Sequence, residues 1–377
     1  MRRKQMAVLF AAAVMAAGMT GCSGGARTTA GTTAASEAAA QEERVEKAGA
    51  GDEAKTAGTG DVKEPESGAE DLEKEPDRGR EAQEAQTDAG EEDEENYDTG
   101  DASMDNTRNQ NDIGDKELLV ISFGTSYNDN RRMTIGAIEE AMEKAFPDYG
   151  VRRGFTSQII IDRVKSRDKV SIDNVGEALD RAVDNGVKTL VVQPTHLMNG
   201  LEYGDLVAEL AEYSDAFEHI AVGEPLLTSE EDFAGVIRAV TEATAEYDDG
   251  ETAICFMGHG TEAESNQVYG RMQKMLADAG YDHYYVGTVE AEPTLEDVLA
   301  AVQKGSYRRV VLEPLMIVAG DHANNDMAGD EEDSWKTVFE NAGYEVVCIL
   351  RGLGELEAVQ QMFVEHAQAA MDRAAQN

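Results

Sequence analysis

Cysteine is scarce in this chain, which has 3 among its 377 residues. Cys255 and Cys348 lie inside apolar runs, and no set of cysteines has the spacing of a structural zinc motif. The sequence therefore excludes a Cys-rich zinc domain. In an exported protein the two thiols could form a disulfide, but two free thiols on different core strands are the favoured interpretation.

Basic residues are also few: the chain has 33 lysines and arginines against 75 aspartates and glutamates, a formal net charge of −42. Such acidity argues against nucleic acid as a partner and against general adhesion to an anionic membrane. It would instead raise the local concentration of divalent cations. The chain also lacks a Gly-rich phosphate-binding fingerprint that opens a helix, which argues against a flavin- or nucleotide-binding protein.

The N-terminus has the layout of a signal peptide. Residues 1–4 are basic, and residues 6–19 form a mostly apolar run that is too short to span a bilayer comfortably. The segment Met19-Thr20-Gly21-Cys22 resembles a bacterial lipobox, in which Cys22 is lipidated and becomes the first residue of the mature chain. An ordinary cleaved secretory signal is the alternative. Both interpretations predict export, and the first predicts a membrane-anchored lipoprotein on the cell surface or the periplasmic side.

Residues 23–116 consist mostly of Ala, Gly, Thr, Glu and Asp and show no apolar periodicity. Such a segment cannot bury enough apolar surface to offset the entropy lost on ordering, so we expect it to be disordered. A flexible coil of roughly 90 residues reaches about 50 Å. We therefore interpret residues 1–22 as a signal and residues 23–116 as a tether between a membrane anchor and a folded module.

Apolar runs of strand length alternate with helix-like segments through the rest of the chain. Strands are expected at 118–123, 151–155, 187–192 and 220–222, and again at 252–257, 284–289, 310–318 and 345–350. This alternation is typical of parallel sheets that helices cover on both faces. We predict an α/β fold of two similar lobes, residues 117–250 and 251–377, each with a four-stranded parallel sheet flanked by helices, and a cleft between them.

Three polar residues follow successive strands of the second half: His259, Glu290 and His322. Parallel α/β sheets bind ligands outside the carboxyl ends of their strands, where the strand order reverses. If the first strand lies inside the sheet, the three side chains converge, and two imidazoles with one carboxylate make an open site for a divalent metal. Asp321 or Asp326 could then orient His322. Taken alone, Glu290 is more simply the start of a turn, so the combination carries the prediction.

The first half offers two kinds of cleft candidate. His196 follows its third strand, where it would either line the cleft or hydrogen-bond within the turn at Pro194. Arg152 and Arg153 alternate along the second strand, so at most one of them can face the cleft. Because basic residues are scarce in this part of the chain, an arginine at the cleft would suit an anionic ligand.

Several motifs lie at these strand ends: Ser122-Phe123-Gly124-Thr125-Ser126-Tyr127, Phe155-Thr156-Ser157-Gln158-Ile159-Ile160, Gln193-Pro194-Thr195-His196, Gly258-His259-Gly260-Thr261, Val286-Gly287-Thr288-Val289-Glu290, and Pro314-Leu315-Met316 through Asp333-Ser334-Trp335-Lys336. Together they resemble the anaerobic cobalt chelatase family, which inserts Co²⁺ into sirohydrochlorin on the way to vitamin B12. The resemblance covers the chain from about residue 118 to its C-terminus.

This resemblance implies a two-lobed chelatase fold related to ferrochelatase. It implies that His259, Glu290 and His322 bind the metal and that His259 also accepts a proton. Co²⁺ would be a substrate, with Fe²⁺ as a second possibility, and no tightly bound cofactor would be required. The other substrate would be sirohydrochlorin or a related tetrapyrrole. The candidates for binding it are polar residues of the first half: Ser122, Thr125, Ser126, Arg153 and His196.

Export departs from this resemblance, because a biosynthetic cobalt chelatase is expected in the cytoplasm with its substrate. The alternative function is a surface lipoprotein that uses a chelatase-like cleft to bind haem, a corrinoid or a metal for uptake. The complete metal set favours catalysis, whereas the anchor and the acidic tether favour uptake. The sequence leaves open whether the chain forms a homo-oligomer.

Overall fold

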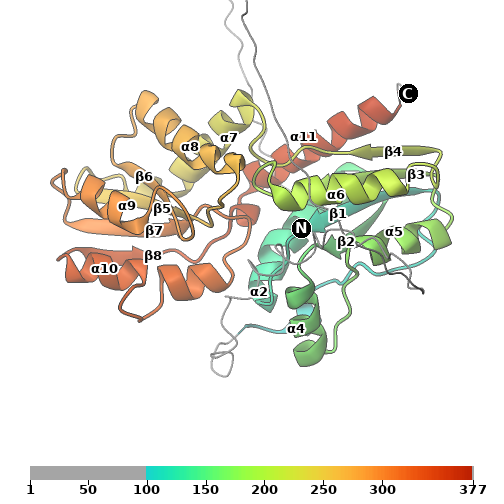
Figure 1. Ribbon diagram of the computed structural model, residues 1–377, viewed down its shortest axis with the longest axis horizontal. Coiled ribbons are helices and arrows are strands. Elements are labelled where there is room, and N and C mark those ends of the chain that lie inside the picture. The colour runs from blue at the N-terminus through green and yellow to red at the C-terminus, as the bar shows by residue number, and fades with distance from the viewer. Residues whose placement is uncertain (1–98, 376–377) are drawn as a thin grey trace, which may run out of the picture. The chain divides into compact units, whose positions relative to one another are not determined.

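Two four-stranded parallel sheets flanked by helices form the fold in the computed structural model, which describes residues 99–375 (Figure 1). The expected signal peptide, the lipidation site Cys22 and the tether up to residue 98 lie outside the described residues. The strands are β1 (Lys116–Ser122), β2 (Gly150–Phe155), β3 (Thr189–Pro194), β4 (His219–Val222), β5 (Thr252–Gly258), β6 (Tyr284–Thr288), β7 (Arg309–Pro314) and β8 (Glu345–Cys348).

The first strand of each half lies in the interior of its sheet. The strand orders are β2-β1-β3-β4 and β6-β5-β7-β8, and all neighbours are parallel. This confirms the predicted fold class and brings the loop after each first strand between the loops after the second and third. The interior strands are continuous apolar runs because helices cover both faces; Leu118 and Ile121 of β1, for example, are 0% exposed.

The helices that cover these sheets begin for recognisable reasons. Asn174 and Ser229 form capping boxes at the starts of α5 and α7, in which the side chain accepts from the backbone three residues on. The helices are α2 (Asn128–Arg131), α3 (Ala137–Ala145), α4 (Gln158–Asp168), α5 (Val175–Asp184), α6 (Leu201–Glu212), α7 (Glu230–Ala243), α8 (Gln267–Asp278), α9 (Leu295–Val302), α10 (Trp335–Asn341) and α11 (Glu357–Ala374). Two π-helices, η2 (Arg132–Gly136) and η5 (Ala323–Met327), and 3-10 helices, among them η1 (Ala102–Met104) and η6 (Leu353–Glu355), complete the set.

Strand β7 ends at Pro314, although the apolar pattern predicted a strand as far as residue 318. Leu315 and Ile317 are 0% and 9% exposed and belong to an apolar cluster that draws residues from both halves. The apolar run after Pro314 therefore packs at the contact between the halves and does not extend the sheet.

Each half is completed by a helix of the other. Helix α11, red in Figure 1, packs against β3, β4 and α3 of the first half. Its buried residues Phe363 and Ala367 share an apolar cluster with Leu118 and Val191 of the first sheet. Helix α7 in turn packs against α8 of the second half. The predicted second lobe, residues 251–377, is therefore wrong at its C-terminal end, because the apolar face of α11 is buried against the first sheet.

Residues 99–115 were expected to belong to the disordered tether, and the structure contradicts this expectation. Arg108 is 2% exposed and donates to Glu139 (3.0 Å), while Asp105 forms ion pairs with Arg131 and Arg153 (2.7 Å each). Buried charges are tolerated where each has a partner. Because composition alone does not reveal such pairing, the boundary predicted at residue 116 is wrong.

Within residues 99–375, no helix is both long and apolar enough to cross a membrane. Cys255 on β5 and Cys348 on β8 are both free, in agreement with the favoured interpretation of the sequence. Burial raises the pKa of the Cys255 thiol, and it raises the pKa of Cys348 to about 11. Both thiols therefore stay protonated at neutral pH.

Candidate metal site at the strand ends

His259 lies in a tight loop at the carboxyl end of β5. Gly260 has a φ of +91°, which residues with a side chain rarely adopt, and a Cβ there would lie 2.8 Å from the Ala291 nitrogen. A Cβ on Gly258 would lie 2.1 Å from the ring of Tyr269, whose hydroxyl accepts a hydrogen bond from Gly260 N (3.3 Å). The two glycines thus let the loop fold against α8 while the His259 side chain stays 46% exposed.

The structure brings His259, Glu290 and His322 together. One ligand atom from each residue lies within 4.8 Å of the other two, and this is the set of metal-ligating side chains found among residues 99–375. The two imidazole rings are perpendicular, with centroids 4.6 Å apart, and His259 Nδ1 lies 3.5 Å from Glu290 Oε2. The side chains of His259 and Glu290 are almost half exposed, so an ion held by them would remain accessible.

Both imidazoles use Nδ1 for hydrogen bonds that fix their orientation. His259 Nδ1 lies 2.9 Å from the carbonyl of Gly260, and His322 Nδ1 lies 2.8 Å from Asp326 Oδ2. A carbonyl and a carboxylate can only accept, so these contacts place the proton on Nδ1. The Nε2 lone pair of each ring is then available for a metal, the arrangement found when a second residue orients a histidine ligand.

Asp326 also alters the basicity of His322. Burial would lower the pKa of His322, but the hydrogen bond and the negative charge of Asp326 outweigh it, with Glu290 and Asp321 adding to the effect. The pKa of His322 is therefore raised above its ordinary value. Of the two aspartates proposed to orient His322, the structure selects Asp326; Asp321 instead accepts a hydrogen bond from Asn325 (3.1 Å).

The first sheet repeats the backbone of this site without its ligands. Ser157 N donates to Phe123 O (3.3 Å), just as Glu290 N donates to His259 O (2.9 Å). The glycine after Phe123 has a φ of +107°, against +91° for the glycine after His259. Phe123, 40% exposed, therefore occupies the position in the first half that His259 occupies in the second.

The third ligand has a counterpart as well. Gly200 and Gly320 each accept a hydrogen bond from the amide four residues on, at 3.1 Å in both cases. Glu202 and His322 each follow two residues after that glycine. Phe123, Ser157 and Glu202 of the first half therefore lie at the positions of His259, Glu290 and His322. These three residues of the first half do not form a comparable group of metal ligands.

The three polar residues predicted to bind substrate from the loop after β1 are buried. Ser122, Thr125 and Ser126 are 1%, 3% and 4% exposed. Ser122 Oγ accepts a hydrogen bond from Thr195 Oγ1 (2.7 Å), and Thr125 Oγ1 accepts one from Tyr127 N (3.2 Å). The hydroxyls of Ser122 and Thr125 are thus hydrogen-bonded within the first lobe, and the burial of all three residues argues against their interpretation as direct substrate contacts.

Arg153 is also wrong as a substrate-binding candidate. Its side chain is 0% exposed and forms ion pairs with Glu139 and Asp105 at 2.7 Å. The neighbouring Arg152 is 0% exposed as well and pairs with Glu117 and Asp173. The two arginines do point to opposite faces of β2, as the alternation predicted, but each face is closed by its own set of carboxylates.

His196 lies at the end of β3, partly buried. Both of its ring nitrogens are buried without a hydrogen-bond partner in the structure. Burial lowers the pKa of His196 to about 4, against a smaller raising effect of Glu202, so the ring is neutral at neutral pH. The structure thus decides between neither interpretation of His196: its ring makes no hydrogen bond within the Pro194 turn, and the residue is not in the metal-ligating set.

Loops of the two halves meet beside the candidate metal site. Asn130 Oδ1 accepts a hydrogen bond from Ala319 N (2.9 Å), three residues before His322. A Cβ on Gly320 would lie 3.1 Å from Thr125 Oγ1. Sequence reasoning missed Asn130, because a single polar residue at the start of a helix carries no signal of a contact 189 residues away.

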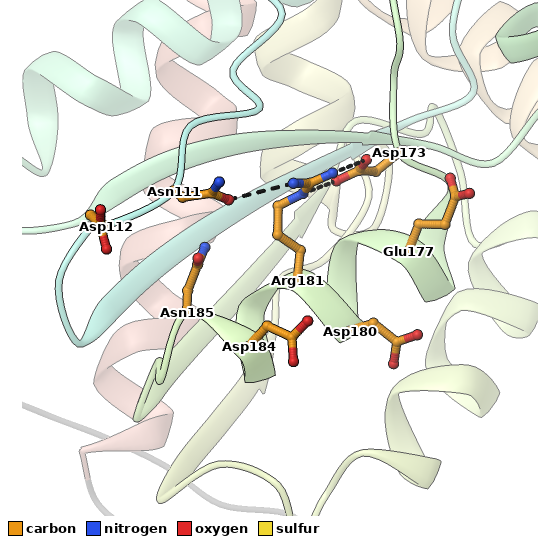
Figure 2. Close-up of a pocket in the computed structure, with 8 residues that line it drawn as sticks. All are labelled: Asn111, Asp112, Asp173, Glu177, Asp180, Arg181, Asp184 and Asn185. Carbon is orange, nitrogen blue, oxygen red and sulfur yellow. Dashed lines mark hydrogen bonds and ion pairs between the residues drawn. The ribbon is translucent and has the colours of Figure 1, made fainter.

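A separate hollow lies on the first half. It measures about 690 Å³ and is lined mainly by acidic and amide side chains of α5 and the preceding segments (Figure 2). Within it, Arg181 is bound to Asp173 through two hydrogen bonds of 2.6 and 2.8 Å and to Asn111 (Figure 2). Its one arginine is already paired, and none of the predicted site residues lines it.

Comparison with known proteins decides the family. A family model described as cobalt chelatase (CbiK) matches residues 116–372, more than half of the chain. The chain belongs to the cobalt chelatase family. It is 36% identical over 259 residues to a sirohydrochlorin cobaltochelatase of Salmonella typhimurium, which covers 69% of this chain and 97% of the relative.

One further relative and one solved structure are also similar to the chain. The chain is 32% identical over 258 residues to the sirohydrochlorin cobaltochelatase CbiKC of Nitratidesulfovibrio vulgaris, covering 68% of this chain and 90% of that protein. Among solved structures, SirB from Bacillus subtilis with Fe3+ is similar at a TM-score of 0.49 and 11% identity, covering 69% and 98% of the two chains. The family match begins at residue 116, so the ordered residues 99–115 lie outside it.

Proposed function

We propose that this chain is a sirohydrochlorin cobaltochelatase, which inserts Co²⁺ into the tetrapyrrole and releases two protons. The observation that carries the proposal is the convergence of His259, Glu290 and His322 within 4.8 Å in a member of the cobalt chelatase family. The two relatives at 36% and 32% identity are named for this activity. Co²⁺ is then a substrate and not a resident cofactor.

An open set of three ligands suits an ion that must be passed on. Three protein ligands leave coordination positions free for incoming ring nitrogens. The hydrogen bonds of His259 with Gly260 and of His322 with Asp326 use Nδ1, so they do not compete with a metal for Nε2. Nitrogens of the tetrapyrrole can therefore replace the protein ligands one at a time, and the ion need not lose all its ligands at once.

Insertion also requires two pyrrole N–H protons to leave the macrocycle. An imidazole displaced from the metal is positioned to accept one of them, which couples deprotonation to insertion. We assign this part to His259, whose side chain is 46% exposed. The carboxylate of Glu290, 3.5 Å from His259 Nδ1, would stabilise the imidazolium that results.

The first half would supply a surface for the macrocycle. Phe123 occupies the position equivalent to His259 and is 40% exposed, although a phenylalanine is usually buried. We assign it an apolar contact with the tetrapyrrole ring, which would remove its side chain from water. Substrate carboxylates would then point toward solvent, and we assign to them Arg132, which is 41% exposed and lies 3.8 Å from Asp129.

The test is a metal-insertion assay with the full chain. Purified protein is incubated with sirohydrochlorin and Co²⁺, and the absorption change of the tetrapyrrole is followed beside the His259→Ala variant and a no-protein control. We expect fast insertion only with the unmodified protein. Equal rates in all three would defeat the proposal, and tight tetrapyrrole binding without insertion would favour the alternative of a lipoprotein that binds haem, a corrinoid or a metal for uptake.

Metal preference and location belong to the same proposal. We propose Co²⁺ as the preferred ion, with Fe²⁺ as a slower one, to be compared under anaerobic conditions in the same assay. We further propose that the chain is exported and anchored through Cys22. Labelling cells with a radioactive fatty acid should mark the unmodified chain and not the Cys22→Ser variant; equal labelling would reject the anchor.

A further inference from the structure

A short N-terminal segment, residues 99–108, is fastened to the loop and helix that follow β1. We call this segment the strap. Thr99 O accepts a hydrogen bond from Asp129 N (3.0 Å), and Gly100 O accepts one from Asn128 Nδ2 (3.3 Å). Arg108, 2% exposed, donates to Glu139 on α3. The strap therefore touches the start of α2 at one end and α3 at the other.

Asp105 is the centre of this contact. Its carboxylate is shared by two arginines that are both 0% exposed: Arg131 Nε donates at 2.7 Å, and Arg153 donates through both terminal nitrogens at 2.7 and 3.1 Å. Burial would raise the pKa of Asp105, but the two arginines outweigh it and hold the pKa below its ordinary value. Asp105 thus carries a full negative charge at neutral pH.

Arg131 connects Asp105 to the loop after β1. Its terminal nitrogens donate to the carbonyl of Thr125 (3.0 Å) and to Asn128 Oδ1 (2.5 Å). The guanidinium is planar and rigid, so the hydrogen bond of its Nε with Asp105 also fixes the terminal nitrogens that donate to the loop. The loop in question joins Phe123 to α2.

The residue before Arg131, Asn130, contacts the second half. Its Oδ1 accepts a hydrogen bond from Ala319 N (2.9 Å), and its side chain is 7% exposed. His322 follows three residues after Ala319. Asp105 is therefore connected to the segment that bears one of the candidate metal ligands by its hydrogen bond with Arg131, by the peptide bond between Arg131 and Asn130, and by the hydrogen bond of Asn130 with Ala319.

We propose that the strap positions the site from outside the segment that the family model matches: Asp105, acting through Arg131, holds the loop that joins Phe123 to α2, and through Asn130 it holds the His322 segment. This inference rests on the proposed function for its kinetic consequences. Asp105, Arg131 and Asn130 are positioning residues, since none of them belongs to the metal-ligating set. The strap lies before residue 116, where the family match begins.

The chain contains a matched control on the opposite face of β2. Asp173 is likewise shared by two arginines, accepting from Arg152 Nη2 (2.9 Å) and from Arg181 Nε (2.6 Å), the latter visible in Figure 2. It is 5% exposed. Asp173→Asn therefore removes an equally buried, doubly paired carboxylate from the same lobe, but one that does not contact the loop after β1.

The experiment compares Asp105→Asn with Asp173→Asn in the full chain by hydrogen exchange and Co²⁺ titration. We expect exchange of residues 124–131 and 317–322 to rise about tenfold or more in Asp105→Asn and to stay unchanged in Asp173→Asn. We expect Co²⁺ affinity to fall by about threefold to tenfold in the first variant alone. Equal changes in both variants, or no change in Asp105→Asn, would overturn the proposal.

Two additions keep the test decisive. Asn130→Ala leaves every buried charge paired, so it remains informative if Asp105→Asn does not fold; we expect weakened Co²⁺ affinity, and unchanged affinity would overturn the link to His322. Exchange and metal titration need no tetrapyrrole, so they judge the strap even if the insertion assay fails. Where insertion is observed, Asp105→Asn should raise KM for sirohydrochlorin more than it lowers kcat.

Discussion

The two halves of this protein share a backbone and differ in the chemistry at the strand ends. In both sheets the first strand lies between the second and the third, and the loop after the second strand donates a backbone hydrogen bond to the loop after the first strand. The loop after the first strand carries His259 in one half and Phe123 in the other. The comparison shows that the duplicated frame positions a side chain without deciding its function; the second half is equipped to hold an ion, and the first offers an apolar surface.

Of the two equivalent residues, His259 and Phe123, removal of the His259 imidazole should have the larger effect. His259→Ala takes away one of three ligands, so we expect Co²⁺ affinity to fall by about 100-fold and insertion to approach the uncatalysed rate. Metal titration and the insertion assay measure both. His219→Ala, an exposed histidine on β4, serves as the control and should change neither. A His259→Ala variant that binds and inserts Co²⁺ normally would show that the two halves do not differ as we propose.

Removing the phenylalanine should give the complementary result. Phe123→Ala deletes the apolar contact assigned to the macrocycle, so we expect KM for sirohydrochlorin to rise about tenfold, as burial of an aromatic side chain allows. Co²⁺ affinity measured without tetrapyrrole should not change. Phe123→Leu, which keeps much of the apolar area, should be affected less. A rise in KM that is equal for Ala and Leu would argue against an apolar contact.

A smaller effect should distinguish the two histidines of the candidate metal site, His259 and His322. Asp326 raises the pKa of His322, and protons compete with the metal for the imidazole. Apparent Co²⁺ affinity should therefore weaken as pH falls through the pKa of His322. Asp326→Asn removes the raising charge, so the midpoint of this loss should move to lower pH, with affinity at high pH reduced by a few-fold because the ring is less well oriented. A midpoint that stays in place would contradict the assigned hydrogen bond.

The last effect concerns folding stability and not metal binding, at Glu313 on β7, whose counterpart on β3 is Gln193. Burial raises the pKa of Glu313 to about 7, although Arg351 acts in the opposite direction. The folded state then binds more protons than the unfolded state between pH 4.5 and 7, so this residue's stabilising contribution is complete below that window and is lost as pH rises through it.

Glu313→Gln makes the two halves alike at this position and removes the titration. Relative to the variant, the unmodified chain should lose about 1–3 kcal/mol of unfolding free energy between pH 4.5 and 7. Denaturant unfolding at several pH values measures the difference. Parallel pH profiles for the two proteins would show that Glu313 titrates normally.

Much of the fold could be predicted because apolar runs and loop motifs repeat along the chain. The interior position of β1 and β5 makes the three strand-end segments neighbours, and His259, Glu290 and His322 were identified from that arrangement. Long-range pairing could not be predicted in the same way. Arg153 was interpreted as a ligand for an anion because its partners, Glu139 and Asp105, lie 14 and 48 positions away.

The same limit explains the errors at both ends of the folded part. An acidic, Gly-rich composition gave residues 99–115 the character of a tether, yet Asp105 and Arg108 are buried because α3 and β2 supply opposite charges. Helix α11 has an apolar face that could cover either sheet, and only the tertiary structure shows that it covers the first. Local pattern predicts elements; it does not identify the partner of a buried charge or of an apolar face.

Direct transfer of bound metal tests the central claim. The protein is loaded with one equivalent of Co²⁺, freed of unbound metal, and mixed rapidly with sirohydrochlorin in the presence of a chelator that traps free ions. The account predicts a single turnover whose amplitude equals the bound cobalt and which is absent in His322→Ala. Insertion that is suppressed by the chelator, or that is equal in both proteins, would contradict it.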